Sequence, residues 1–227
     1  MEKVVVVILM AGLSTRFEGP TNKQLALLKG KPIFSYSINA FNKSKLVDEI
    51  VLVVNKNNKE EIEKFIKTKK ITAKIVLGGL TRQVSVECAL KTIKCNKNDI
   101  VIIHDGARPL VSDLDIENVT KAAKKYGAST TYIEATDTIA NIAKGGFVSS
   151  FEDRSKIALI QTPQAFKYDV LIKSHKNAKN KNATDDASLV LLNKGKIKLV
   201  KGNKRLNKVT TKEDLVFLEG LSKYERV

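Results

Sequence analysis

The 227-residue sequence predicts an α/β fold: a doubly wound, mostly parallel sheet with a projecting β-hairpin arm. The first observation behind this prediction is that apolar runs typical of buried strands alternate with segments patterned as helices. The second is that residues 136–154 interrupt this alternation with two short strand-like segments around Gly145-Gly146. The third is composition: 43% hydrophobic and 28% charged residues, with no linker-like boundary, fit one soluble domain over residues 1–227.

The strand assignments begin with Val4–Met10, a continuous apolar run of the kind that a central parallel strand requires. Further strands are expected at Ile50–Val54, Lys74–Leu77, Ile100–Ile103, Ser129–Ala135, Ala158–Gln161 and Lys196–Val200. Because these strands alternate with helices, most of them should run parallel. Ligands in such sheets bind at the carboxyl ends of the strands, so the loops that follow the strands are expected to carry the chemistry.

The helix assignments depend on capping signals as well as on apolar spacing. Pro32 precedes the first helix, as a proline at the first helical position does, and Ser112 with Asp115 forms a capping-box pattern. Thr211 with Asp214 repeats that pattern before the last helix. The expected helices are Ile33–Phe41, Lys59–Lys69, Arg82–Ile93, residue 112 to about 126, Lys167–Ala178, residue 184 or 185 to 193, and one from residue 211.

The predicted hairpin consists of Thr138–Ala143 and Phe147–Phe151, and we expect it to be a dimerisation arm. It carries more apolar side chains than a free two-stranded arm should expose, and an isolated hairpin is marginal in water. These side chains are Ile139, Ile142, Phe147, Val148 and Phe151. Packing against a second copy of the chain would cover them, which predicts a homodimer. The alternative is a hairpin folded back onto its own sheet.

The net charge of +16 raises the possibility of a nucleic-acid-binding protein. However, the 34 lysines are spread over the whole chain and aromatic residues do not interleave with them, so we favour solvated lysine-rich faces and no nucleic-acid partner. No apolar run approaches the ~20 residues of a membrane helix, so no membrane association is expected. Without a visible secretory signal, and with Cys88 and Cys95 matching no zinc spacing, a cytoplasmic protein is predicted.

The loop after the first strand is a candidate phosphate-binding site. Its small residues allow backbone N–H groups to approach a phosphate, and Arg16 and Lys23 add two cations. It matches neither the P-loop nor the dinucleotide-binding pattern, so an ordinary turn with two surface cations stays open. After the third strand, Gly78 and Gly79 leave room for a flat group such as a base, although a plain glycine turn capped by Thr81 is equally consistent.

The fourth strand is followed by His104-Asp105-Gly106-Ala107-Arg108-Pro109. A carboxylate there, Asp105, would suit a metal ion or a substrate hydroxyl, and Arg108 could bind a phosphate with two hydrogen bonds. The alternative is a turn aspartate with a surface arginine. His104 is interpreted as a buried, hydrogen-bonded histidine, and Thr184 to Asp186 as a helix cap.

Taken together, these loops offer hydroxyls, carboxylates and cations without a cysteine nucleophile or a metal cluster, an inventory that suits transfer at a phosphate. Their order resembles the 2-C-methyl-D-erythritol 4-phosphate cytidylyltransferase family over about residues 4–219. The matching segments are AGLSTR with NKQ, GGLTRQVSV, HDGARP, DTI, DR, QTPQAF, TDDASLV and KVTTKEDL. The resemblance implies a Rossmann-like nucleotidyltransferase fold and a Mg²⁺-dependent transfer of CMP from CTP to methylerythritol phosphate, with release of pyrophosphate, in non-mevalonate isoprenoid synthesis.

The resemblance also implies roles for individual residues. Arg16 and Lys23 would stabilise the transferring phosphate, while Arg154 and Lys208 would orient the attacking phosphate. The nucleotide would be bound by Met10, Ala11, Gly12, Thr15, Gly78, Gly79, Arg82 and Ser85. The sugar phosphate would be bound by Asp105, Arg108, Thr138, Thr162 and Thr184, with Asp105 also a candidate metal ligand. Thr138 and Arg154 would reach the active site of a partner subunit.

The chain departs from the family pattern in two places. Met10 replaces the first alanine and Ser14 the second glycine of the usual Ala-Ala-Gly-x-Gly loop, and residues 203–207 differ from the usual acidic and amide residues. Three alternatives therefore stay open: a ribitol-5-phosphate cytidylyltransferase, a catalytically inactive relative, and a basic nucleic-acid-binding protein.

Overall fold

A central sheet of seven strands runs through the computed structural model, which describes residues 2–12 and 24–222. The strand order is β11-β7-β10-β6-β1-β4-β5, and every neighbouring pair is parallel except those that involve β10, which is antiparallel to both β6 and β7. The strands are β1 (Val4–Leu9), β4 (Glu49–Val54), β5 (Lys74–Leu77), β6 (Ile100–Asp105), β7 (Ala128–Glu134), β10 (Ala158–Lys167) and β11 (Lys198–Lys201). The predicted mostly parallel α/β sheet is confirmed.

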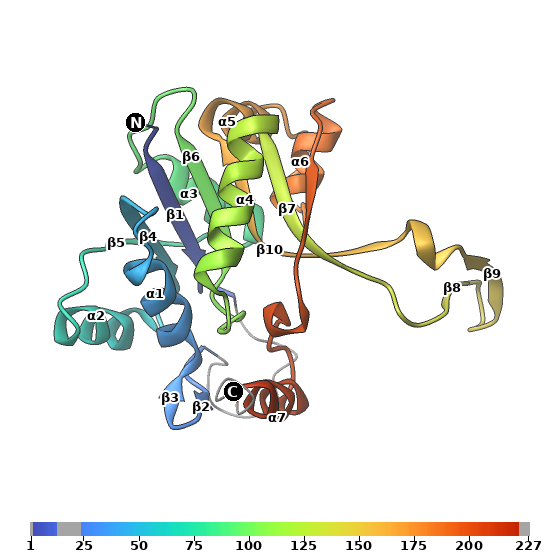
Figure 1. Ribbon diagram of the computed structural model, residues 1–227, viewed down its shortest axis with the longest axis horizontal. Helices are drawn as coiled ribbons and strands as arrows, with labels where there is room; N and C mark the ends of the chain where they lie inside the picture. Colours follow the sequence, from blue (N-terminus) through green and yellow to red (C-terminus); the bar gives the residue numbers. More distant parts are fainter. Residues whose placement is uncertain (1, 13–23, 223–227) are drawn as a thin grey trace.

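Helices cover both faces of this sheet (Figure 1). Because side chains alternate along a strand, Val6 and Ile8 of β1 face one core while Val5 and Val7 face the other. The first core is completed by α1 (Ile33–Lys43), α2 (Lys59–Thr68) and α4 (Asp113–Tyr126). The second is completed by α3 (Arg82–Leu90), α5 (Tyr168–Lys176) and α6 (Asp186–Leu192). This is the two-sided covering that doubly wound sheets require.

A small third core lies outside the two helical layers. It joins the C-terminal helix α7 (Lys212–Leu221) to a two-stranded hairpin, β2 (Leu27–Leu28) and β3 (Lys31–Pro32), which was not predicted. Two positive φ angles, 48° at Lys29 and 74° at Gly30, make the tight turn between the strands. The Val209 amide donates to the carbonyl of Ala107, so this third core is tied to the loop after β6.

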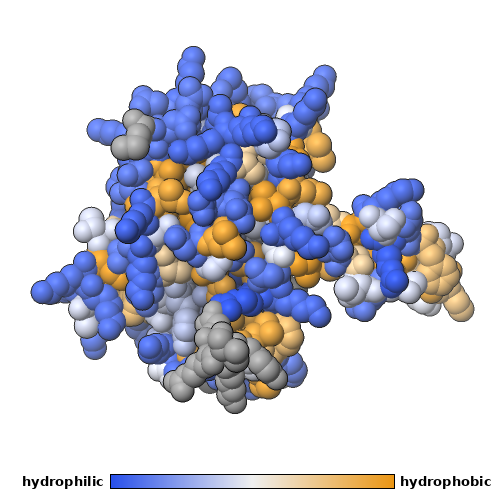
Figure 2. Space-filling model, viewed as in Figure 1, coloured by the Kyte–Doolittle hydropathy of each residue, from blue (hydrophilic) through white to orange (hydrophobic). Residues whose placement is uncertain are grey.

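The predicted arm extends away from the sheet, at the right of Figure 1. It contains β8 (Ile139–Ile142) and β9 (Val148–Glu152), followed by a short 3₁₀ helix, Arg154–Lys156. Figure 2 shows hydrophobic surface at its outer end. Among the side chains of the arm, Ile142, Phe147 and Phe151 are 81%, 74% and 69% exposed. The alternative in which the hairpin folds onto its own sheet is therefore wrong.

Several predicted boundaries are corrected. β6 continues through His104 and Asp105, which were assigned to a loop, and α3 ends at Leu90 rather than at Ile93. The strand predicted at Ala158–Gln161 continues to Lys167 as the ten-residue strand β10, so residues 162–166, which lay beyond the predicted strand, also belong to it. An irregular register between Ile160 and Gln164 accompanies a cis peptide bond at Thr162-Pro163, so proline occurs in a strand where the regular ladder is interrupted. Among the described helices, none is long and apolar enough to cross a membrane.

Candidate active site

Two adjacent pockets lie beside the loops that follow the parallel strands. The first pocket, about 270 Å³, is lined by residues after β1, β4 and β5, including Ala11, Gly12, Asn55, Gly79 and Ser85. The second pocket, about 350 Å³, is lined by Arg108, Ile160, Gln161, Thr162, Gln164, Thr184 and Asp185. Arg82, Asp105 and Lys208 line both. We call these three residues the shared wall.

The first pocket is shaped by close packing around Gly78 and Gly79. A Cβ on Gly78 would lie 2.5 Å from the Ala11 Cβ and 2.8 Å from the Ser85 Oγ. The loop after β5 can therefore contact the loop after β1 only because residue 78 is glycine. The Gly79 amide donates to the Ser85 Oγ at 3.2 Å, and the Ser85 hydroxyl donates to the Thr81 carbonyl at 2.9 Å. Ser85 thus fixes the turn as well as lining the pocket.

Met10 lies beneath the first pocket and is absent from its lining. Its side chain is fully buried, its amide donates to the Val53 carbonyl, and its own carbonyl accepts from the Asn58 side chain at 2.8 Å. Both backbone groups of Met10 are therefore hydrogen-bonded to neighbouring segments of the protein. Asn55, which was not predicted, lines the pocket and donates to the Ala11 carbonyl at 3.2 Å. The sequence did contain a signal for Asn55, because the residue directly follows a parallel strand, where ligand-binding loops are expected.

Asp105 sits at the centre of the shared wall and faces three cations. Its carboxylate oxygens lie 2.9 Å from the Lys208 Nζ, 3.4 Å from the Arg82 Nε and 3.6 Å from the Arg108 Nε. Burial alone would raise the pKa of this carboxyl, but the three cations more than offset that effect and hold the pKa well below its usual range. Asp105 is therefore ionised, and the wall keeps a net excess of positive charge.

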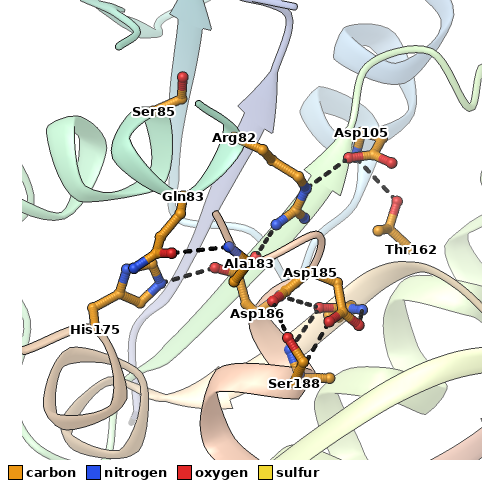
Figure 3. Close-up of polar contacts among 12 residues, drawn as sticks. Arg82, Gln83, Ser85, Asp105, Thr162, His175, Ala183, Asp185, Asp186 and Ser188 are labelled. Atoms are coloured by element: carbon orange, nitrogen blue, oxygen red, sulfur yellow. Dashed lines mark hydrogen bonds and ion pairs between the residues drawn. The ribbon is translucent and has the colours of Figure 1, made fainter. Parts of the chain in front are cut away.

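Arg82 is held at a second point by Asp186, the first residue of α6. Its Nη1 donates to the Asp186 carboxylate at 2.6 Å, so the guanidinium lies between Asp105 and Asp186 (Figure 3). Asp185 caps α6 by accepting the Ser188 amide at 3.0 Å, as the sequence predicted for this segment. Thr184, immediately before it, is exposed and lines the second pocket.

A directional chain of hydrogen bonds holds the residues after β6. The His104 Nε2 lies 3.1 Å from the Arg108 carbonyl, which can only accept, so this nitrogen carries the proton. The Nδ1 must then accept from the Thr162 hydroxyl at 3.3 Å, and that oxygen accepts the Asp105 amide at 3.0 Å. Thr162 lines the second pocket, but its hydroxyl is committed to this chain. The interpretation of His104 as a buried, hydrogen-bonded histidine is confirmed.

The remaining predicted residues are not brought into the two pockets of this chain. Thr138 and Arg154 are exposed, belong to the arm and its base, and line neither pocket. Arg154 instead donates to the Thr136 carbonyl. Thr15, Arg16 and Lys23 lie outside the described residues.

Asp105 is a poor fit for a magnesium ligand because its carboxylate already pairs with three cations. Mg²⁺ usually binds one or two carboxylates together with substrate phosphates. Within residues 2–12 and 24–222, no three histidine, cysteine, aspartate or glutamate side chains gather closely enough to hold a metal ion. The described residues therefore provide no preformed magnesium site.

A glycine-lined pocket that shares a cationic wall with a second, phosphate-compatible pocket, at the carboxyl edge of an α/β sheet, defines the class: a nucleotidyltransferase. The family model described as "2-C-methyl-D-erythritol 4-phosphate cytidylyltransferase" matches residues 4–222. The chain belongs to this family.

Curated relatives and solved structures agree with this assignment. Relatives named 2-C-methyl-D-erythritol 4-phosphate cytidylyltransferase include those of Clostridium acetobutylicum, 40% identical over 96% of each chain, and Clostridium novyi, 40% identical over 97% of each. The 4-diphosphocytidyl-2C-methyl-D-erythritol synthase of Anaerococcus prevotii has a TM-score of 0.84 at 26% identity, covering 98% of this chain and 99% of that one. The cytidylyltransferase of Thermus thermophilus has a TM-score of 0.78 at 28% identity, with 98% and 100% coverage.

We predict that Gly78→Ala weakens CTP binding. The new Cβ would clash with the Ala11 Cβ and the Ser85 Oγ and displace the loop that lines the first pocket, so the affinity for CTP should fall. Gly220→Ala is the control, because a Cβ at that helical position would meet nothing within 4 Å. Titration calorimetry with CTP compares the two variants, and equal affinities would contradict the assignment of Gly78.

We predict that His104 makes stability depend on pH. Burial lowers the pKa of His104 from 6.5 to about 4, so between these values only the unfolded chain binds this proton. The free energy of unfolding should therefore fall as the pH falls from 6.5 to 4, by up to about 3 kcal/mol. Urea unfolding across this range should show a shallower loss for His104→Gln, and parallel profiles for the two proteins would contradict the prediction.

Proposed function

We propose that this protein transfers CMP from CTP to the phosphate of 2-C-methyl-D-erythritol 4-phosphate and releases pyrophosphate. The observation that carries the proposal is the shared wall, because Arg82, Asp105 and Lys208 line both pockets. The reaction joins two phosphates, so its two substrates must meet at one place with positive charge on both sides. The names of the relatives, at 40% identity over nearly the whole chain, support the same reaction.

The first pocket is proposed to hold CTP. Gly79, Ser85 and the backbone of Ala11 and Gly12 line this pocket and combine polar groups with apolar surface, which suits a base and ribose. The loop that continues from Gly12 carries Thr15, Arg16 and Lys23, which we propose to bind the triphosphate and stabilise charge on the transferring phosphate. A base-binding site lined by fixed backbone groups should select cytosine over other bases.

The second pocket is proposed to hold the acceptor phosphate. Arg108 and Lys208 both approach the Oδ2 of Asp105, at 3.6 and 2.9 Å, and Thr162 and Thr184 line the same pocket. The acceptor phosphate is already an anion, so the transfer needs no general base. The main barrier is the repulsion between two polyanions, and fixed cations lower it most effectively in a partly buried site.

Mg²⁺ is part of the proposal through the resemblance to the family. Since Asp105 already pairs with three cations, the phosphates of CTP would supply most of the metal's ligands. When bound there, the metal would neutralise phosphate charge. The residues of the chain would keep their own roles of binding and orienting the two substrates.

The proposed activity is tested by measuring pyrophosphate release with CTP and a panel of C4 and C5 sugar-alcohol phosphates. We expect turnover with methylerythritol phosphate, and with CTP in preference to ATP or UTP. A preference for ribitol 5-phosphate would instead assign the sister activity. No turnover with any acceptor, despite CTP binding, would indicate an inactive relative.

We predict that Lys208→Ala lowers kcat about a hundredfold, since removing one donor from a site of developing charge typically costs this much. The two arginines still balance Asp105 in the variant, so the fold should persist. Lys204→Ala is the matched control, because Lys204 is an exposed lysine that lines neither pocket. Equal kcat values for the two variants would show that Lys208 is not part of the active site.

A homodimer with composite active sites is proposed on the basis of the arm. Phe147 and Phe151 of the arm are largely exposed, and Thr138 and Arg154 line neither pocket of their own chain. A second copy that packs against the arm would bury the phenylalanines and bring these two polar side chains to the neighbour's acceptor pocket.

Mixing two inactive variants, Arg154→Ala and Lys208→Ala, tests this arrangement. If Arg154 acts on the neighbouring subunit, a mixed dimer contains one site with both changes and one site with neither. Activity should therefore partly return after subunit exchange. Absence of recovery after verified exchange, or an active monomer in sedimentation, would refute the composite site.

A further inference from the structure

His175 is a buried polar residue that the proposed transfer does not use. The chain has two histidines, and the hydrogen bonds around His104 already account for the first. His175 lies on α5, is 3% exposed, and lines neither pocket. A buried imidazole far from bulk water needs a reason for its polarity, because burying an unsatisfied polar group is costly.

The contacts of His175 lead directly to the shared wall. Its Nε2 lies 2.8 Å from one oxygen of Asp186, and the other oxygen of Asp186 accepts the Arg82 Nη1 at 2.6 Å. Burial would raise the pKa of Asp186, but Arg82 and His175 offset this and lower it, so the carboxylate is ionised and accepts both hydrogen bonds. The Nε2 of His175 is therefore the donor, and Nδ1 faces Glu87 at 3.6 Å.

Arg82 has one nitrogen left for a substrate. Its Nη1 is committed to Asp186 and its Nε to Asp105, while Nη2 is buried and has no hydrogen-bond partner among the described residues. Because a guanidinium is planar and rigid, fixing Nη1 and Nε also fixes the direction of Nη2. A rotation of the Asp186 carboxylate would therefore turn Nη2 with it.

The backbone around Arg82 and Asp186 is held in place, so rotation of the Asp186 side chain is the main movement that could redirect Nη2. The Gln83 side chain, one residue after Arg82, donates to the Asn180 carbonyl at 3.0 Å and accepts the Ala183 amide at 3.1 Å (Figure 3). Together with the Lys181–Glu87 ion pair at 2.6 Å, these contacts hold the segment before α6 against α3. The backbone of Asp186 is thus fixed relative to Arg82, and the hydrogen bond from His175 fixes its side chain.

We propose that His175 is a positioning residue that acts through Asp186 to aim Arg82 at the substrate phosphates. The inference rests on the proposed function, because it assigns Arg82 to the wall where the two substrates meet. An imidazole is suited to this task, since its ring supplies an N–H donor in a fixed plane.

The test compares three variants for kcat, for KM with each substrate, and for thermal stability. His175→Leu keeps a similar volume but removes the donor, and we expect kcat/KM to fall about ten- to hundredfold, as loss of a hydrogen bond to a charged group predicts. His175→Gln places an amide donor near the position of Nε2 and should restore most of that loss. Ser174→Ala is the control, because this buried neighbour on α5 bonds only to the Val170 carbonyl in the described hydrogen-bond network and should keep wild-type kinetic constants.

A double-mutant cycle with Arg82→Lys shows whether the effect passes through Arg82. In that background His175→Leu should cost less than threefold, since there is no guanidinium left to aim. An unchanged cost in that background would overturn the proposal, as would wild-type kinetics for His175→Leu or failure of His175→Gln to restore activity. If His175→Leu does not fold, His175→Asn replaces it, because its shorter amide does not reach Asp186.

Failure of the proposed function gives a different result. A folded wild-type protein that binds CTP but transfers CMP to no acceptor would defeat the proposed function, and this inference with it. A fully active wild type whose His175→Leu and Ser174→Ala variants behave alike would defeat only the inference.

Discussion

The buried carboxylate of Asp105 is the interaction around which the site is built. Arg82 comes from the start of α3, Arg108 from the loop after β6, and Lys208 from the segment before α7, and all three approach this one group. Without the carboxylate, three cations would repel one another in a partly buried space, because a buried ion pair that loses one partner leaves uncompensated charge. Asp105 thus allows the protein to hold three cationic side chains close together at the point where two phosphates are proposed to meet.

The need to hold Asp105 and its cations in place also explains the buried polar residues beneath the pockets. Arg82 is shared between Asp105 and Asp186, and Asp186 is in turn held by His175. On the other side, His104 and Thr162 fix the backbone of Asp105. Apart from the Arg82 Nη2 that is proposed to face the substrate, the hydrogen bonds of these chains hold the side chains in one geometry. Hydrogen bonds therefore hold the side chains of the cationic wall in fixed positions. This favours electrostatic preorganisation over movement during the reaction.

Much of the fold was predictable from local patterns. The apolar run of β1, the capping box at Ser112 and the glycine turn of the arm all have physical causes within a few residues. Sequence order also predicted that Gly78, Asp105 and Lys208 belong to one site. The predicted end of the strand Ala158–Gln161 was wrong, because β10 continues to Lys167 as an antiparallel strand whose register is irregular between Ile160 and Gln164. From the sequence alone, the proline and glutamines of this segment argue against a strand. Proline is tolerated here because the hydrogen-bond ladder of β10 is interrupted between Ile160 and Gln164.

The sequence by itself determined the fold class, the loops that carry the chemistry and the family, because each of these is encoded in short segments and their order. Only the tertiary structure decided which side chains of those loops meet. Met10 lies in the core rather than in the pocket, and Asn55 reaches the pocket from an unremarked loop. His175 is 93 positions from Arg82 in the sequence numbering yet separated from it by one carboxylate. Such contacts depend on how helices pack across a sheet, and residue order does not record that geometry.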